Sequence, residues 1–241
     1  MNSSKQNKKA LEIVIYIYNE MTMLDAIGPY EILRNLSDVN IRFVAKQKGE
    51  IIADSQFVHL LAKHDITEVQ KADILLIPGS TVAFVREIND KKVLNWIKKM
   101  NETTQKTVSV CTGSIILGAT GLLKGKSSTT HWKTMGLLTK FGAIARRERI
   151  VEDGKFISSA GVSAGMDMAL CLANLLRGEK AAKAAQLIIE YDPKPMFDSG
   201  NYATAESDVI EQAEKLLKKE AINDLSLWEM MKNYSVLKEM K

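Results

Sequence analysis

Apolar runs of strand length recur along the chain, and helical patterns lie between them. Most of these runs are continuously apolar rather than alternating, and they span 11–18, 41–45, 72–77, 107–110 and 155–159. Helical patterns are found at about 25–36, 93–100, 113–123 and 164–176. Strands that are almost continuously apolar are typical of parallel sheets covered on both faces. The pattern therefore predicts an α/β fold with a doubly wound, mostly parallel central sheet.

The length of 241 residues is enough for one large domain with a core of its own. We expect a single domain over 11–241 that includes a C-terminal helical extension, preceded by a disordered polar tail over 1–10. The tail lacks the apolar segment and the cleavage site of a secretory signal. Two cysteines, Cys111 and Cys171, are too few for a disulfide framework and predict a reducing, cytoplasmic environment.

The formal net charge is +4, and the basic residues are mostly interleaved with acidic ones. Since there is no basic stripe with interspersed aromatic residues, no nucleic-acid partner is expected. No apolar run approaches the length that crosses a bilayer, so we expect a soluble protein without a membrane partner. No Cys/His spacing indicates a metal site, and no glycine-rich loop indicates a dinucleotide or phosphate. Neither a metal nor a cofactor is expected.

Cys111 lies in a turn of small residues between an apolar strand and a helix, in the sequence VSVCTGS at 108–114. Such a turn lifts the side chain off the sheet and places it near the unpaired N–H groups of a helix N-terminus. Both effects favour the thiolate, so we expect a lowered pKa and a nucleophilic Cys111. A buried structural cysteine is the alternative. Cys171 lies mid-helix among apolar residues and is assigned to the core as an inert thiol of raised pKa.

A nucleophilic thiol needs a partner that handles protons, and Asp25, shortly after the first strand, is the leading candidate. The alternative is that Asp25 only caps the following helix. The backbone N–H groups of Gly79 and Ser80, where another strand ends, are candidates for facing an anionic intermediate, or they form a plain turn. His131 is the histidine that follows the cysteine in sequence, and it either acts as a base or simply packs.

Several segments taken together resemble the ThiJ/PfpI superfamily. They are LDAIGP at 24–29, DILLIPG at 73–79, SVCTGS at 109–114, TTHW at 129–132 and SAGVSAGMD at 159–167. The resemblance extends from Leu11 to Tyr191. It implies a flavodoxin-like sandwich, related to the class I glutamine amidotransferase domain, with a nucleophile elbow at Cys111. Members often form homodimers. Within the superfamily, the sequence is most similar to the isocyanide hydratase branch.

That resemblance assigns roles residue by residue. Cys111 would be the nucleophile, Asp25 the acid/base carboxylate and Thr112 a neighbouring hydroxyl. The remaining assigned positions are Gly79, Ser80 and Gly113 in the pocket, with His131 and Val162 behind them. Many relatives have a second glycine where this chain has Ser80, which predicts a narrower pocket. The protease-like branch has histidine directly after the cysteine, where this chain has Thr112, so a peptidase is not expected.

The resemblance implies a small-molecule substrate, an isocyanide, which would form a thioimidate with Cys111 and then an N-substituted formamide. The alternatives are another thiol-dependent activity, glyoxalase-like or amidase-like, and a redox or stress sensor in which Cys111 is oxidised. A sensory domain of an AraC-type regulator is a further alternative. The fifty residues after Tyr191 are too few for the usual pair of helix-turn-helix units, which weakens that interpretation.

Overall fold

The structure, a computed structural model, describes residues 10–238 and Met240, and the predicted tail over 1–10 lies outside them except for Ala10. A seven-stranded sheet forms its centre, in the order β10-β11-β7-β6-β1-β2-β5. All neighbouring strands are parallel except the pair β10–β11. The strands are β1 (Leu11–Tyr16), β2 (Val39–Ala45), β5 (His64–Asp65), β6 (Ile74–Ile77), β7 (Lys106–Val110), β10 (Ile150–Asp153) and β11 (Phe156–Ser159). The predicted α/β fold with a mostly parallel sheet is confirmed.

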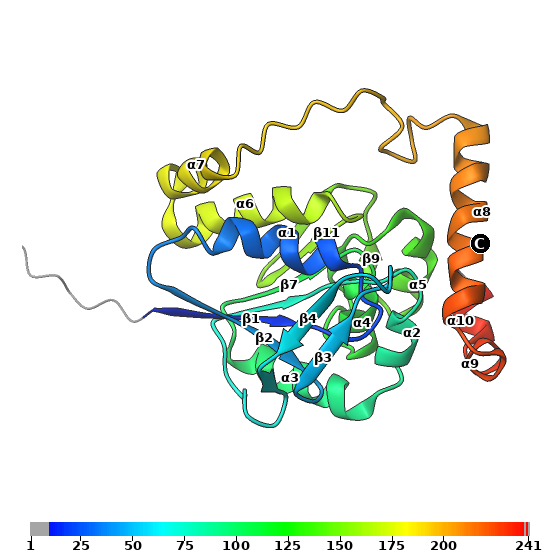
Figure 1. Ribbon diagram of the computed structural model, residues 1–241, viewed down its shortest axis with the longest axis horizontal. Helices are drawn as coiled ribbons and strands as arrows, with labels where there is room; N and C mark the ends of the chain where they lie inside the picture. The colour runs from blue at the N-terminus through cyan, green and yellow to red at the C-terminus, as the bar shows by residue number, and fades with distance from the viewer. Residues whose placement is uncertain (1–9, 239, 241) are drawn as a thin grey trace, which may run out of the picture.

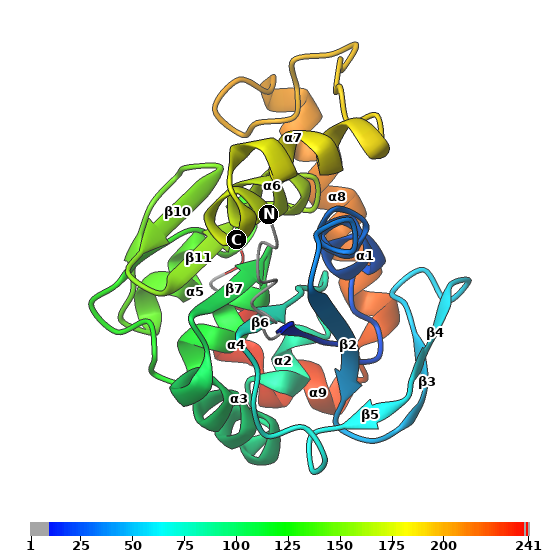
Figure 2. The same ribbon diagram turned by 90° about the vertical axis from the view of Figure 1, so that its left-hand side faces the viewer.

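Helices cover both faces of this sheet (Figures 1 and 2). One face carries α1 (Met23–Leu33), α6 (Ala164–Arg177) and α7 (Glu179–Ile188), and the other carries α2 (Phe84–Glu87), α3 (Lys91–Thr103) and α4 (Gly113–Ala119). All four residues of β6 are buried, as expected for a strand enclosed by two helical layers. Residues 132–140 form a short 3₁₀ helix, η1 (Trp132–Thr134), and α5 (Met135–Lys140).

Local signals account for where the helices begin and which faces they bury. Helix α3 begins after Asp90, whose side chain accepts hydrogen bonds from the Lys92 and Val93 backbone N–H groups. Its buried side chains are Val93, Trp96, Ile97 and Met100, the spacing of one helical face. Helix α6 carries its polar residues Asp167 and Asn174 on the same helical face as Cys171, four residues before it and three after it. Cys171 is on the exposed side, and its assignment to the core was wrong.

Short paired strands outside the main sheet have no clear sequence signal. β3 (Gly49–Ile52) and β4 (His59–Ala62) form an antiparallel hairpin, and β8 (Ser127–Ser128) pairs with β9 (Ile144–Ala145). Figure 2 shows the hairpin at the β2 side of the sheet. The hairpin matters for the site because its connecting loop carries Asp54.

The C-terminal arm, defined here as 207–238, contains α8 (Ser207–Asp224), α9 (Leu227–Lys232) and α10 (Tyr234–Lys238). Residues 189–206 form a connection without helix or strand between α7 and this arm. Figure 1 shows that this connection crosses from α7 to α8, which stands at the edge where the parallel strands end. Within the described residues, no helix is both long and apolar enough to cross a membrane.

Candidate active site

The carboxyl ends of β1, β6 and β7 meet at the centre of the sheet. The chain leaves β1 toward β2 on one side, and later returns to place β6 on the other, which creates a topological switch point. Ile77 of β6 lies beside Ser109 of β7, so the turns that follow these strands leave the sheet together. This arrangement brings Asp25, Gly79 and Cys111 to one place.

Cys111 occupies the sharp turn predicted between β7 and α4. Its φ of 56° lies in the left-handed region, which non-glycine residues seldom adopt. Its backbone N–H donates to the carbonyl oxygens of Ser159, at 3.1 Å, and Ala160, at 2.9 Å. Its own carbonyl accepts from the hydroxyls of Ser114, at 2.9 Å, and Thr130, at 3.0 Å. These bonds on both sides of the residue hold the strained conformation in place.

The Cys111 side chain is only 5% exposed. Burial and the nearby Asp25 carboxylate raise the pKa of the thiol well above its usual value, and the Thr112 backbone N–H opposes them only in part. The predicted lowering of this pKa was therefore wrong. The helix start does favour the thiolate, but the loss of hydration around the buried sulfur is the larger effect. In the resting site Cys111 is a neutral thiol that needs a base.

Asp25 is the base available to it. The residue is fully buried in the first turn of α1, and its Oδ2 accepts the Gly79 backbone N–H at 2.9 Å. Its Oδ1 is buried and has no hydrogen-bond partner among the described residues. Burial raises the pKa of Asp25 to about 7, and the Gly79 N–H counteracts this only in part. Thr22, not Asp25, is the N-cap residue of α1, so the capping alternative was wrong.

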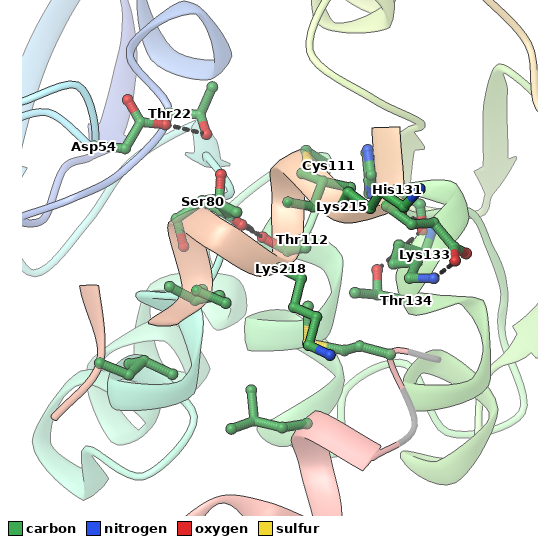
Figure 3. A pocket seen from close by; sticks show the side chains of 18 of the residues that line it. Thr22, Asp54, Ser80, Cys111, Thr112, His131, Lys133, Thr134, Lys215 and Lys218 are labelled. Carbon is green, nitrogen blue, oxygen red and sulfur yellow. Dashed lines mark hydrogen bonds and ion pairs between the residues drawn. The ribbon is translucent and has the colours of Figure 1, made fainter. Parts of the chain in front are cut away.

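The Thr112 hydroxyl joins the turn after β6 to the turn after β7 (Figure 3). It accepts the Ser80 backbone N–H at 2.8 Å and donates to the Ser80 carbonyl at 2.8 Å. The N–H groups of Gly79 and Ser80 are thus occupied, by Asp25 and Thr112. Their predicted role in facing an anionic intermediate does not agree with this geometry.

Gly79 and Gly113 permit the close approach of these turns. A Cβ atom at Gly79 would lie 2.5 Å from the Thr112 nitrogen and 2.9 Å from Asp25 Oδ2. One at Gly113 would lie 2.1 Å from the Ile77 carbonyl oxygen. All three distances are too short for real atoms. These glycines therefore bring the nucleophile turn, the aspartate and the strand ends together.

A cavity of about 590 Å³ opens above Cys111. Of the residues expected at the site, Ser80, Thr112, His131 and Val162 also line it. Asp25 does not line the cavity, but its carboxyl interacts with the Cys111 thiol, which does. The opposite wall comes from the C-terminal arm, which the sequence did not place at the site.

His131 is the N-cap residue of η1, and its Nδ1 accepts the Lys133 backbone N–H at 3.4 Å. Burial, helped by Lys133, lowers the pKa of His131 to about 4, so the ring is neutral at pH 7. Its ring contacts Trp132, which in turn stacks on Tyr202 of the connection. In the described part of the chain, no hydrogen bond links His131 to Cys111 or Asp25.

Among the polar cavity residues that were not expected from the sequence, Thr22 and Asp54 lie on the core side. The Thr22 hydroxyl donates to Asp54 Oδ2 at 2.8 Å, and both side chains line the cavity (Figure 3). Thr22 lies three residues before Asp25, and this short spacing is a weak indication that Thr22 is near the same site. Asp54 had none, because its position depends on the β3–β4 hairpin. Among residues 10–238 and Met240, no group of His, Cys, Asp or Glu side chains is suited to hold a metal ion.

Comparisons with known proteins agree with this architecture. The model of the DJ-1/PfpI family matches residues 11–175. Isonitrile hydratase of Pseudomonas putida is 38% identical over 207 residues, which cover 86% of this chain and 90% of that protein. The crystal structure of a ThiJ/PfpI family protein from Pseudomonas syringae has a TM-score of 0.82 at 32% identity, covering 91% of this chain and 95% of that one.

More distant structures share the fold alone. Drosophila melanogaster DJ-1beta superimposes with a TM-score of 0.68 at 16% identity, covering 76% of this chain and all of that one. The part it leaves out is about a quarter of the chain. The resemblance read from the motifs is thus confirmed at the level of the family, and this chain belongs to the DJ-1/PfpI family.

Proposed function

We propose that the protein is a cysteine-dependent isocyanide hydratase, which adds water to an isocyanide and releases an N-substituted formamide. The observation that carries the proposal is the buried pair formed by the Cys111 thiol and the Asp25 carboxyl. The pKa of Asp25, about 7, suits a group that both accepts and donates a proton. The similarity to isonitrile hydratase of Pseudomonas putida, over most of both chains, supports the choice of substrate.

In the first half of the reaction, Asp25 removes the proton from Cys111 as the sulfur attacks the terminal carbon of the isocyanide. A carbon–sulfur bond forms, and the electron pair left on that carbon takes the proton back from Asp25. The product is a thioimidate, in which the former isocyanide carbon carries one hydrogen. Because the same proton leaves sulfur and arrives at carbon, this half needs no outside acid or base.

In the second half, Asp25 removes a proton from water as the oxygen attacks the thioimidate carbon. The tetrahedral intermediate then breaks its carbon–sulfur bond, and its nitrogen and the sulfur each end with one proton. N-substituted formamide leaves, and Cys111 returns to the thiol. A neutral thiol at rest is consistent with this cycle, because Asp25 is paired with it as the base.

Thr112 and His131 have supporting roles in this proposal. The Thr112 hydroxyl fixes the turn of Cys111 against Ser80, so it acts by positioning the nucleophile. His131 is neutral at pH 7 and lines the cavity without a hydrogen bond to the thiol within the described structure. A proton relay through His131 is therefore not part of the proposal.

The test is isocyanide consumption by purified protein, followed through the infrared stretching band of the isocyanide group. Cys111→Ala should abolish formamide formation while Cys171→Ala, which removes the exposed thiol, keeps it. Asp25→Asn should lower kcat by about 10²–10⁴, the usual contribution of a general acid/base. Unchanged turnover in Cys111→Ala would show that the thiol is not the nucleophile.

A further inference from the structure

The cavity above Cys111 has two different halves. The half that the core supplies is mainly polar, with Thr22, Asp54, Ser80, Thr112 and His131. The half that the C-terminal arm supplies contains a group of apolar side chains from α8 to α10. These are Leu217, Ala221, Leu225, Met230 and Leu237. A substrate in this cavity therefore meets the reactive groups at one end and an apolar wall at the other.

The charged residues of the arm do not offer the cavity a strong net charge. Lys133 of the core is ion-paired with Glu214 of α8, and Lys215 is paired with Glu211 at 2.7 Å. Figure 3 shows the Lys133 pair at the side of the cavity. Lys218 is an exposed side chain. Since two of the three lysines along this cavity are neutralised by glutamates, an uncharged occupant suits it best.

Hydrogen bonds from the core to α9 and to Asn233, which follows it, hold the C-terminal arm against the core. Arg86 Nε of α2 donates to Glu229 Oε1 at 2.5 Å, and Asn89 Nδ2 donates to Asn233 Oδ1 at 2.8 Å. Leu225 and Asn233 are almost fully buried, at 3% and 5% exposure. The arm is thus packed on the core over the cavity.

The shape of an isocyanide decides which part of it meets this wall. The R–N–C unit is linear and its terminal carbon is the atom that Cys111 would attack. The substituent R then extends away from the thiol, toward the arm. The reacting group has two heavy atoms and needs a small part of the 590 Å³ cavity, so most of that volume surrounds R.

We infer that the C-terminal arm selects the substrate, and that the protein prefers isocyanides whose substituent is large, apolar and uncharged. This inference rests on the proposed function and specifies the substrate class for the same site. The selecting side chains are those of the apolar wall, and Ala221, the smallest of them, is the position where a larger side chain adds the most volume. The wall contacts no reacting atom, so its effect falls on binding.

The first experiment measures kcat/KM for ethyl, butyl and hexyl isocyanide. Each methylene buried against the wall should raise kcat/KM about fourfold, mainly through KM, so hexyl should exceed ethyl on the order of a hundredfold. Ala221→Phe should lower the value for hexyl by roughly tenfold or more, and that for ethyl much less. Glu220→Phe places the same ring on the neighbouring exposed position and should change neither.

The second experiment probes the cavity through the alkylation rate of Cys111, and it does not require hydratase activity. Iodoacetamide and N-hexyl iodoacetamide alkylate thiols with loss of iodide, and mass spectrometry follows Cys111 and Cys171 in one sample. Cys171 is exposed and serves as the internal reference. The hexyl reagent should modify Cys111 faster relative to Cys171 than iodoacetamide does, and Ala221→Phe should remove that advantage.

The two experiments separate the inference from the proposed function. If no isocyanide is hydrated but the alkylation preference stands and Ala221→Phe abolishes it, the proposed reaction fails while selection by the arm is supported. Hydration without dependence on chain length would overturn selection by the arm. A higher kcat/KM for 5-carboxypentyl isocyanide than for hexyl isocyanide would overturn the preference for an uncharged substituent.

Discussion

Cys111 and Gly79 together allow the turn after β7 to approach the turn after β6. The left-handed backbone of Cys111 directs the chain into α4, and the missing side chain of Gly79 lets the Thr112 backbone approach. Asp25 is held at this junction through the Gly79 N–H. A change at Gly79 therefore affects the position of the nucleophile turn and of the carboxylate at once.

Gly79→Ala should destabilise the fold by roughly 1–3 kcal/mol and lower the activity, because the new methyl group overlaps Thr112 and Asp25. Urea unfolding and an isocyanide assay measure the two effects. Gly200→Ala is the matched control, since a Cβ there meets nothing within 4 Å. Equal stability of the two variants would mean that the turns separate without cost.

Asp54 influences the reaction through charge. Its carboxylate raises the pKa of Asp25, as burial does to a larger extent, while the Gly79 N–H and Cys111 lower it. If Asp25 acts as the base, kcat/KM should rise with pH as Asp25 ionises near pH 7. Asp54→Asn removes the neighbouring negative charge, so the pKa of Asp25 falls and the acidic limb of the profile should move to lower pH.

Measuring kcat/KM between pH 5 and 9 tests whether the acidic limb moves in this direction. Asn at position 54 keeps one oxygen, which can accept from Thr22, and the exposed Ser55 N–H that now donates to Asp54 Oδ1 can donate to water instead, so the loop should hold its place. Asp198→Asn changes an exposed aspartate of the connection and should leave the limb where it is in the wild type. A limb that stays fixed in Asp54→Asn, or moves to higher pH, would contradict the electrostatic role.

At the scale of elements, the C-terminal arm depends on one glutamate that serves two purposes. Glu229 accepts from Arg86 of α2, and its carboxylate also completes a capping box with Ser226 at the start of α9. Hydrogen bonds from Arg86 and Ser226 lower the pKa of Glu229 to about 2, so this carboxyl group is ionised at pH 7. The Glu229 side chain therefore both caps the start of α9 and anchors the arm to the core.

Glu229→Gln should loosen the arm without unfolding the sheet. We expect faster amide exchange over 225–238 and a higher KM for a hexyl-substituted substrate, with the midpoint of global unfolding nearly unchanged. Hydrogen exchange read by mass spectrometry locates the effect. Glu179→Gln breaks an exposed pair with Lys183 inside α7 and is the control. Unaltered exchange in the arm would show that apolar packing alone holds it.

The sequence predicted the central elements because their patterns are local. The apolar runs of β1, β6 and β7 show burial on both faces, and the spacing of Val93 to Met100 shows the buried face of α3. The turn at Cys111 was predicted from its small residues. The exposed position of Cys171 was missed because its immediate neighbours in sequence are apolar, although the helical spacing of Asp167 and Asn174 places Cys171 on the polar face of α6.

Features that depend on distant parts of the chain escaped prediction. Asp54 reaches the cavity on a hairpin of two short strands, and the arm reaches it after a connection that shows no docking signal. The direction of the Cys111 pKa was missed for a related reason. A helix start can be recognised in sequence, but the depth at which the whole molecule buries a thiol cannot.

At the scale of the whole molecule, the site has a consequence for stability. Burial raises the pKa of Asp25 to about 7 in the folded protein, above its ordinary value near 4 in an unfolded chain. The folded state therefore holds this proton more tightly than the unfolded state does. The stabilising contribution of the group is complete below about pH 4 and is lost as the pH rises through about 7.

Asp25→Asn removes that dependence while keeping the size of the side chain and an oxygen for the Gly79 N–H. The free energy of unfolding of the variant, relative to wild type, should increase between pH 4 and pH 8 by up to about 4 kcal/mol. Urea unfolding at several pH values measures it. The pKa of Glu87 is also raised to about 7 by burial, but Glu87 is present in both proteins, so its contribution cancels. Parallel stability curves would mean that Asp25 titrates alike in the folded and unfolded chains. A relative gain confined to higher pH would show that the fold gives up stability to keep a carboxylate beside Cys111.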